Sequence, residues 1–354
     1  MFDYKMAIDI TPKPRLVWID TAKAICILLV VLQHTSNYTH INYPYMYDFQ
    51  TFRMPLYFIL SGLFFKQYEG FVGFVKRKTN KLIIPYVFFF SVGGVFLPIT
   101  LFHFFDIRIW SYKDYGIEAF LKIFSEQCIC NPSIWFLVCL FEINILFYII
   151  FELAEHFNKL LDKNYIILLI SLCFGLVGII MSLLHINLPY FVDSSFSAIP
   201  FFCFGWFLRN QTEYLYWKNT PKGIYISIFL IISSMIFIHF TNLGGASFLG
   251  NSLGGVIQCA QLYPYGIIGT LCVLTFARIL GNIPLISYIG RYSIIVLCTH
   301  AYLIQFSAFI TSHFIEKNLY VIFVVAVIIQ VLIIPFFIKY LGYFTAQKDL
   351  IKIK

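Results

Sequence analysis

The stretch Arg15–His34, RLVWIDTAKAICILLVVLQH, decides how the rest of the chain is interpreted. Charged residues near its start are followed by an apolar run from Ala24 to Leu32 and then by the polar pair Gln33-His34. This pattern predicts a membrane helix with Lys23 near one end and His34 near the other. Because eleven residues separate the two, they lie within roughly 20° of each other around a helix and about 16 Å apart along its axis.

The composition places the chain among integral membrane proteins. Hydrophobic residues make up 60% of the 354 residues and charged residues only 12%, about half the roughly 25% that is usual in a soluble domain. The net charge of +8 does not indicate a nucleic-acid partner, because Lys and Arg stand at the ends of apolar runs and form no basic stripe. Most cysteines lie inside apolar runs, so no disulfide framework and no metal site are expected.

Apolar runs of membrane-spanning length predict an all-α helical bundle. We expect about ten transmembrane helices in one membrane-embedded domain over residues 1–354, with no attached soluble domain and two long outer loops, Asp106–Ser133 and Thr241–Gly255. Lys and Arg concentrate between alternate spans, which predicts cytoplasmic termini and a multi-pass location in a bacterial inner membrane. The expected spans are Val17–Ser36, Phe52–Phe65, Leu82–Phe104, Ile134–Leu153, Tyr165–Leu184, Phe196–Leu208, Ile224–Phe240, Val256–Leu280, Leu285–Phe309 and Leu319–Leu341.

Ionisable side chains at membrane depth are functional candidates, because a charge in hydrocarbon without a partner or water is unfavourable by several kcal/mol. The candidates are Lys23, His34, Arg53, Glu142 and His300. Each also has a structural interpretation. Lys23 can snorkel to the cytoplasmic interface, His34 can bond water at the outer boundary, and Glu142 can pair with Arg53. A lone His300 is more typical of an interhelical hydrogen bond.

Several motifs, taken in order, favour a functional interpretation. Lys23 precedes His34 by eleven residues, and FRMPLYFILSG (Phe52–Gly62) and the basic segment FVKRKTNKLIIPY (Phe74–Tyr86) follow. Later landmarks are Trp135-Phe136-Leu137, FFCFGWFLR (Phe201–Arg209) and ISYIGRYSIIVLCTH (Ile286–His300). This ordered set resembles the acyltransferase-3 family of membrane acyltransferases over nearly the whole chain.

Within that family, FRMPLYF is most similar to the branch that includes fucose 4-O-acetylase-like proteins. Two positions depart from the family pattern. Arg53 stands where that branch has a His, and Lys23 stands where an Arg is commoner. Lysine keeps the charge but lacks the bidentate fork with which arginine binds phosphate.

The resemblance implies an acetyl-CoA donor, used as a co-substrate without a metal. CoA has an anionic nucleotide end and a long, thin arm. Cations at the cytoplasmic face would bind the phosphates, and Lys23, Arg77 and Lys81 are the expected ligands. Lys76 and Lys78 fit a positive-inside anchor better. The separation of about 16 Å between Lys23 and His34 is on the scale of the CoA arm.

The acceptor is expected to be a surface or lipid-linked carbohydrate on the outer side. His34 would take the proton from its hydroxyl group as a general base, and an acyl-histidine intermediate is the alternative. Glu142 or a backbone carbonyl would orient the imidazole ring. The remaining expected substrate contacts are Arg53, Ser61, Trp135 and His300.

Two other classes of protein stay open at this stage. A secondary transporter or flippase for a lipid-linked or small anionic substrate could line its path with Lys23, Glu142 and His300, although no matching pair of broken helices is found. An inactive family member could serve as an assembly partner. Binding or hydrolysis of acetyl-CoA by the purified protein discriminates between an enzyme and a transporter. The acceptor sugar, the choice between acetyl and succinyl, and the oligomeric state also stay open.

Overall fold

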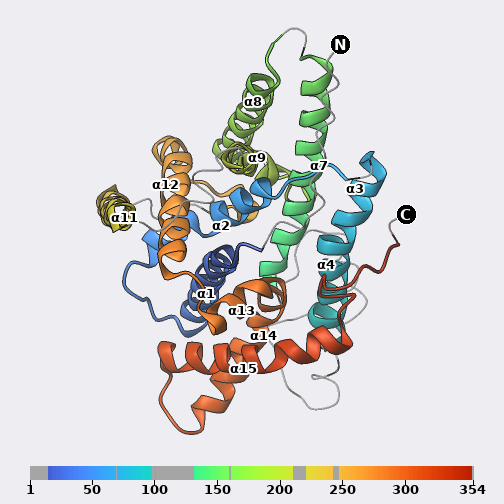
Figure 1. The fold of residues 1–354 in the computed structure, drawn as a ribbon. Helices are drawn as coiled ribbons and strands as arrows, with labels where there is room; N and C mark the ends of the chain where they lie inside the picture. The colour runs from blue at the N-terminus through green and yellow to red at the C-terminus, as the bar shows by residue number, and fades with distance from the viewer. Residues whose placement is uncertain are drawn as a thin grey trace.

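The regular elements of the chain are helices (Figure 1). The computed structural model describes residues 15–68, 70–97, 100, 131–158, 161–209, 221–241 and 247–352. The helices are α1 (Val17–Thr39), α2 (Met46–Leu63), α3 (Gly70–Lys78), α4 (Ile84–Phe88), α7 (Trp135–His156), α8 (Lys163–Leu183), α9 (Val192–Leu208), α11 (Pro221–Thr241), α12 (Val256–Leu280), α13 (Pro284–Arg291), α14 (Ser293–Ser312) and α15 (Leu319–Tyr340). Two π-helical segments, η1 (Thr79–Ile83) and η2 (Phe89–Phe96), flank α4. Short 3₁₀ turns are η4 (Pro132–Ile134), η5 (Pro189–Phe191) and η6 (Leu249–Asn251).

Eight helical segments in the described ranges are long and apolar enough to cross a membrane, which confirms the predicted all-α membrane bundle. The other two expected spans correspond to α2 and α11, which are helical but are not among these eight segments. A total of ten crossings therefore stays a prediction. Most of the expected outer loop Asp106–Ser133, up to residue 130, lies outside the described residues, as do residues 242–246 of the second loop.

Two expected spans differ in their boundaries from the observed helices. The third helical segment runs continuously from Gly70 to Phe96. The basic cluster, which consists of Lys76, Arg77, Lys78 and Lys81, therefore lies inside this segment and not before it. The ninth expected span is divided into α13 and α14 at Tyr292, whose carbonyl accepts bonds from the amides of Ile295 and Val296. An apolar run longer than a helix hides such a break, because hydropathy alone does not report backbone direction.

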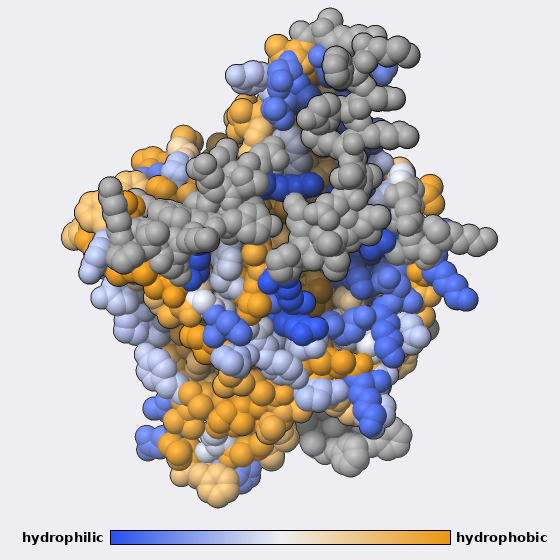
Figure 2. Space-filling view, in the orientation of Figure 1, coloured by the Kyte–Doolittle hydropathy of each residue, from blue (hydrophilic) through white to orange (hydrophobic). Residues whose placement is uncertain are grey.

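Helices α1, α7 and α9 lie inside the bundle, and α8 and α15 lie at its surface. More than half of the spanning window is buried in α1, α7 and α9 (56%, 61% and 67%), compared with 28% in α8 and 22% in α15. Around α1 pack α2, α12, α13 and α14. Figure 2 shows hydrophobic side chains over the part of the face where α14 and α15 lie, with hydrophilic ones gathered across its middle. The inner position of α1 is consistent with a site built on it.

A glycine on each of two helices lets α2 and α9 cross almost backbone to backbone. A Cβ atom on Gly62 would lie 1.9 Å from the carbonyl oxygen of Phe202, and a Cβ on Gly205 would lie 1.9 Å from that of Ile59. Beside this crossing the ring of Phe147 packs on the ring of Phe202, with centroids 4.8 Å apart. The crossing fixes α2, and with it the face of α2 that is turned toward α1.

The C-terminal segment after α15 is bound to the π-helical turn η1. The fully buried Asn80 accepts the backbone amides of Leu350 and Ile351 at 2.9 and 2.8 Å and donates to the Ile351 carbonyl at 2.8 Å. The ammonium of Lys81 bonds the Ala346 carbonyl at 2.8 Å and lies 3.0 Å from the Asp349 carboxylate. Residues far apart in the sequence therefore hold η1, in the middle of the third helical segment.

Candidate functional site

One face of α1 lines a cavity of about 200 Å³ that contains both residues singled out from the sequence. Lys23, Ile27, Val30 and His34 all contribute to its wall. Their spacing of three or four residues is that of one helix face, so the expected common orientation of Lys23 and His34 is observed. The cavity therefore runs along the helix with a cation at one end and an imidazole at the other.

The other walls come from elements that follow α1 in the chain, from α2 to α14. Aliphatic, aromatic and hydroxyl side chains form them: Met54, Tyr57 and Ser61 of α2, Leu82 of η1, Ser133 of η4, Trp135, Phe136, Leu137 and Leu140 of α7, and Ser293, Ile294 and Leu297 of α14. Between Lys23 and His34 the α1 face contributes the apolar Ile27 and Val30. The hydroxyl groups in the other walls belong to Tyr57, Ser61, Ser133 and Ser293. Ser61 and Trp135, both expected substrate contacts, lie in this wall.

At the imidazole end, a serine hydroxyl bridges two histidines. The Ser133 Oγ atom lies 3.1 Å from His34 Nε2 and 3.2 Å from His300 Nε2. The two imidazole rings are tilted by 50° with centroids 5.0 Å apart. His300 is fully buried and lies behind Ser133, outside the cavity wall. Its described contact on this side is Ser133, and its expected contact with the substrate stays a prediction.

Ser133 is held in place by the residues on either side of it. The fully buried Asn131 donates through Nδ2 to the Cys298 carbonyl of α14 at 2.7 Å. Pro132 then begins the 3₁₀ turn that leads into α7, and its fixed φ favours this first helical position. Sequence reasoning missed both Asn131 and Ser133. The signal was the Asn-Pro-Ser triplet just before Trp135, which marks the entry of a helix that carries a family motif.

At the cationic end, the ammonium of Lys23 forms no salt bridge with a carboxylate of the described residues. Its described contact is the ring of Phe64, with the Nζ atom 5.8 Å from the centroid. The nearby Asp20 carboxylate accepts Arg15 Nε at 2.7 Å and Arg15 Nη2 at 3.0 Å. This hydrogen bond raises the pKa of Arg15 above its usual value. Among the described residues, no hydrogen bond or ion pair occupies the Lys23 ammonium.

Two of the ionisable candidates lie away from the cavity wall. Glu142 accepts a hydrogen bond from Ser195 of α9 at 2.6 Å, and no described contact joins it to His34. Arg53 is buried on α2, where its Nη1 donates to the Leu29 carbonyl at 3.2 Å. The pairing of Glu142 with Arg53 that the sequence allowed is wrong, because Glu142 takes Ser195 as its partner. The group beside the His34 ring is Ser133 and not Glu142.

The basic cluster lies next to the cavity without lining it. Leu82 forms part of the wall, and Lys81 directly before it is engaged by Asp349 and Ala346. The Arg77 guanidinium stacks on Tyr68, 4.1 Å from the ring centroid. The expected binding of a donor by Arg77 and Lys81 therefore stays a prediction, and Lys23 is the cation that lines the cavity.

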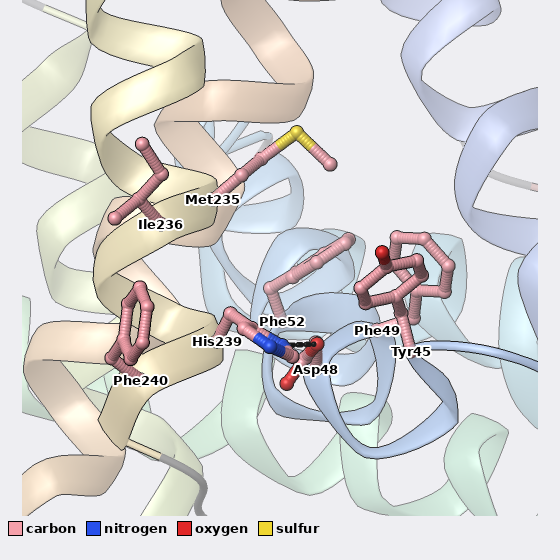
Figure 3. A pocket seen from close by; sticks show the side chains of 8 residues that line it. All are labelled: Tyr45, Asp48, Phe49, Phe52, Met235, Ile236, His239 and Phe240. Atoms are coloured by element: carbon pink, nitrogen blue, oxygen red, sulfur yellow. Dashed lines mark hydrogen bonds and ion pairs between the residues drawn. The ribbon is translucent and has the colours of Figure 1, made fainter.

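A second cavity of about 290 Å³ lies between α2 and α11 (Figure 3). Its wall consists mainly of aromatic and aliphatic side chains such as Phe49, Phe52 and Met235. The imidazole of His239 and the carboxylate of Asp48 bond each other in it at 3.1 Å. Although this cavity is the larger of the two, its His239 and Asp48 side chains bond each other, so we assign the site to the cavity along α1.

The α1 cavity suits transfer of a group carried by an elongated anionic donor. Its wall carries the Lys23 ammonium and an imidazole that is able to move a proton, with the apolar Ile27 and Val30 between them on α1. A family profile described as an acyltransferase domain matches residues 16–340, a range that includes every wall residue. No curated protein and no solved structure matches the chain. The chain belongs to the acyltransferase-3 family of membrane acyltransferases.

Proposed function

We propose that the protein transfers an acetyl group from acetyl-CoA to a hydroxyl group of a carbohydrate, with His34 as the general base. One observation carries the proposal: Lys23 and His34 lie on the same face of α1 and line a single cavity. Among the described residues, Lys23 has no carboxylate partner. The acceptor is a surface or lipid-linked glycan presented at the outer side, and the donor comes from the cytoplasm. The positive-inside distribution of Lys and Arg supports this orientation.

The cationic end supports an anionic donor. A buried or half-buried ammonium without a counter-ion is unfavourable, and a phosphate group removes that cost by forming a charge-assisted hydrogen bond. Lys23 meets this description because Asp20 is held by Arg15. The same end is close to the cytoplasmic face in the proposed orientation. Lys23 is therefore the proposed ligand of a CoA phosphate.

The size of the cavity supports a thin acyl carrier. Its volume of about 200 Å³ lies below the roughly 300–1,000 Å³ of pockets that enclose a drug-sized ligand. A pantetheine arm is slender and mostly apolar, which fits walls such as Val30, Leu137 and Leu297. The nucleotide would stay outside at the Lys23 end. The thioester would then reach the imidazole, about 16 Å along α1 from Lys23.

The proposed reaction is a direct transfer. The His34 imidazole takes the proton of the acceptor hydroxyl as the oxygen attacks the thioester carbonyl. The carbon–oxygen bond forms, the carbon–sulfur bond breaks, and the imidazolium returns the proton to the CoA thiolate. The products are an O-acetyl ester and CoA, and His34 is regenerated. General acid–base catalysis of this kind contributes about 10²- to 10⁴-fold to a rate.

Two variants and a matched control test the proposal with purified protein in lipid. His34→Ala should lower kcat for acetyl transfer by about 10²- to 10⁴-fold and leave the KM for acetyl-CoA nearly unchanged. Lys23→Ala should mainly raise that KM. His239→Ala removes another membrane-helix histidine, which lies in the second cavity, and should behave like the parent protein. Full transfer by His34→Ala would remove the catalytic assignment.

The acceptor is tested in cells. Mass spectrometry of surface glycans should show an acetyl group that is present with the parent protein and lost with His34→Ala at equal membrane abundance. Indifference to acetyl-CoA together with movement of an intact solute would contradict the enzyme and favour transport.

A further inference from the structure

The bridge between His34 and His300 has a direction, and that direction follows from one backbone carbonyl. His300 Nδ1 lies 3.0 Å from the Val296 carbonyl oxygen, one helical turn earlier on α14. A carbonyl only accepts hydrogen bonds, so Nδ1 carries the proton. His300 is fully buried, with no carboxylate among its described contacts, so the neutral form is favoured. Its other nitrogen, Nε2, is therefore an acceptor.

The Ser133 hydroxyl has one proton to donate and two histidines beside it. Because His300 Nε2 is an acceptor, the Ser133 hydroxyl donates to His300. The Ser133 oxygen then accepts a bond from His34 Nε2, which must carry a proton. The series of donors runs from His34 to Ser133 to His300 to Val296. The reverse direction would place the lone pair of His300 Nδ1 against the Val296 carbonyl.

We propose that Ser133 and His300 are positioning residues that hold His34 in the Nε2-protonated tautomer and so make its Nδ1 atom the base. The proposal rests on the proposed function of His34. None of the described residues bonds Nδ1, and His34 lines the cavity. When Nδ1 takes the proton of the acceptor hydroxyl, the imidazolium charge strengthens the bond from Nε2 to Ser133. The proton passes from the acceptor hydroxyl to Nδ1 and then to the CoA thiolate. No proton passes through Ser133.

The arrangement has the logic of a hydrolase triad built from neutral groups. In a triad, a carboxylate fixes the tautomer of the histidine and stabilises the imidazolium. Here a hydroxyl, itself polarised by a second imidazole, does so without a buried anion. A buried anion beside the cavity would attract Lys23 and repel the phosphates of the donor. The neutral series therefore suits a site that must keep an ammonium free for an anion.

The supporting contacts show that Ser133 is held where it is by groups outside the series. Asn131 fastens the segment before α7 to the Cys298 carbonyl. Thr299, next to His300, accepts a bond from Gln330 of α15 at 2.5 Å and donates to the Ile295 carbonyl at 2.7 Å. Neither hydrogen bond of Thr299 involves Ser133 or His300. Thr299 also provides a matched control, because it is buried on the same turn and takes no part in the bridge.

Nitrogen NMR of histidine-labelled full-length protein in lipid nanodiscs tests the proposal, since the two imidazole tautomers differ in their nitrogen shifts. The parent protein should show His34 protonated at Nε2, and Ser133→Ala should give a mixture of tautomers. In acetyl transfer, Ser133→Ala and His300→Ala should lower kcat by about 10- to 100-fold, the loss expected for one hydrogen bond to a charged group, with the KM for acetyl-CoA unchanged. His300→Gln should recover much of kcat because its amide oxygen can accept from Ser133.

Three outcomes overturn the proposal: His34 protonated at Nδ1 in the parent protein, a tautomer that does not respond to Ser133→Ala, or the same loss of kcat in Thr299→Val as in His300→Ala. Failure of the proposed function looks different. In that case His34→Ala keeps its activity, whatever tautomer the spectrum shows. If His34→Ala is inactive and the tautomer is wrong, only the positioning role is lost.

Discussion

Asp20 binds Arg15 and leaves Lys23 without its nearest carboxylate. Both Arg15 Nε and Arg15 Nη2 donate to Asp20, at 2.7 and 3.0 Å. Asp20 precedes Lys23 by three residues, a separation at which side chains on a helix meet. The ion pair at the start of α1 therefore keeps an anion away from the Lys23 ammonium and leaves it available for a phosphate.

The first prediction is that Arg15→Ala weakens donor binding although Arg15 does not line the cavity. The released Asp20 carboxylate would turn to Lys23 and compete with the phosphate of acetyl-CoA. The KM for acetyl-CoA should rise about three- to tenfold, equivalent to roughly 0.7–1.4 kcal/mol, with kcat retained. Initial rates over a range of acetyl-CoA concentrations provide the measurement.

The double variant Arg15→Ala with Asp20→Asn is the control for this prediction. It lacks the arginine but also the competing charge, so its KM should return close to that of the parent protein. If the double variant keeps the raised KM, Arg15 acts on the donor by another route and the role given to Asp20 is wrong.

The second prediction concerns Val30, which lies in the cavity wall between Lys23 and His34. Val30→Phe adds a ring to a narrow passage and should exclude the pantetheine arm, so that transfer from acetyl-CoA falls by at least about tenfold. Filling an existing cavity is better tolerated than overpacking a full core, so the protein should still fold. Leu28→Phe, on α1 but outside the cavity wall, is the matched control. Equal activity in the two variants would show that the arm does not pass Val30.

Local periodicity explains why the cavity face of α1 was predictable. Lys23 and His34 belong to one helix, and the helical repeat alone brings them to one face. Ser133 could not be found in this way, because it lies 99 residues from His34 and 167 from His300 along the chain. Its position depends on how α7 and α14 pack against α1, which no local pattern states.

Glu142 shows the complementary limit. Helix α7 is apolar on nearly every side because it lies inside the bundle, so its sequence does not tell which face is turned toward α1. In the structure Trp135, Phe136 and Leu140 line the cavity. Glu142 instead accepts a hydrogen bond from Ser195 of α9. The sequence allowed an ion pair of Glu142 with Arg53, whereas the carboxylate accepts a part-buried hydrogen bond from Ser195.

The third prediction tests the crossing that fixes α2. Gly205→Val places a Cβ atom where the Ile59 carbonyl oxygen lies, 1.9 Å away, so the two backbones must separate. The midpoint of thermal unfolding in detergent should fall by several degrees, because overpacking is unfavourable by about 1–3 kcal/mol. Gly255→Ala is the control, since an added Cβ there meets only the flexible end of Gln258, at 3.1 Å. A parent-like midpoint for Gly205→Val would contradict the close crossing.

The fourth prediction separates two roles of Lys81, as a donor ligand and as an anchor for the C-terminal segment. Its ammonium contacts Asp349 and Ala346, and the adjacent Asn80 makes three hydrogen bonds to Leu350 and Ile351. Asn80→Ala leaves these backbone groups unpaired. Each group that water does not bind instead lowers the free energy of unfolding by about 1–3 kcal/mol. The variant should therefore expose the C-terminal segment to limited proteolysis.

Lys81→Ala and Asp349→Asn remove the same ion pair from its two sides, which makes them the decisive comparison. If Lys81 only anchors the segment, both variants should raise proteolysis slightly and equally and leave the KM for acetyl-CoA unchanged, because a half-exposed ion pair contributes only about 0–1 kcal/mol. If Lys81 also binds a CoA phosphate, the two variants change the KM for acetyl-CoA in opposite directions. Lys81→Ala should raise the KM, whereas Asp349→Asn should lower it by freeing the ammonium. Equal KM values in both variants would leave Lys23 as the phosphate ligand and assign Lys81 to the C-terminal segment alone.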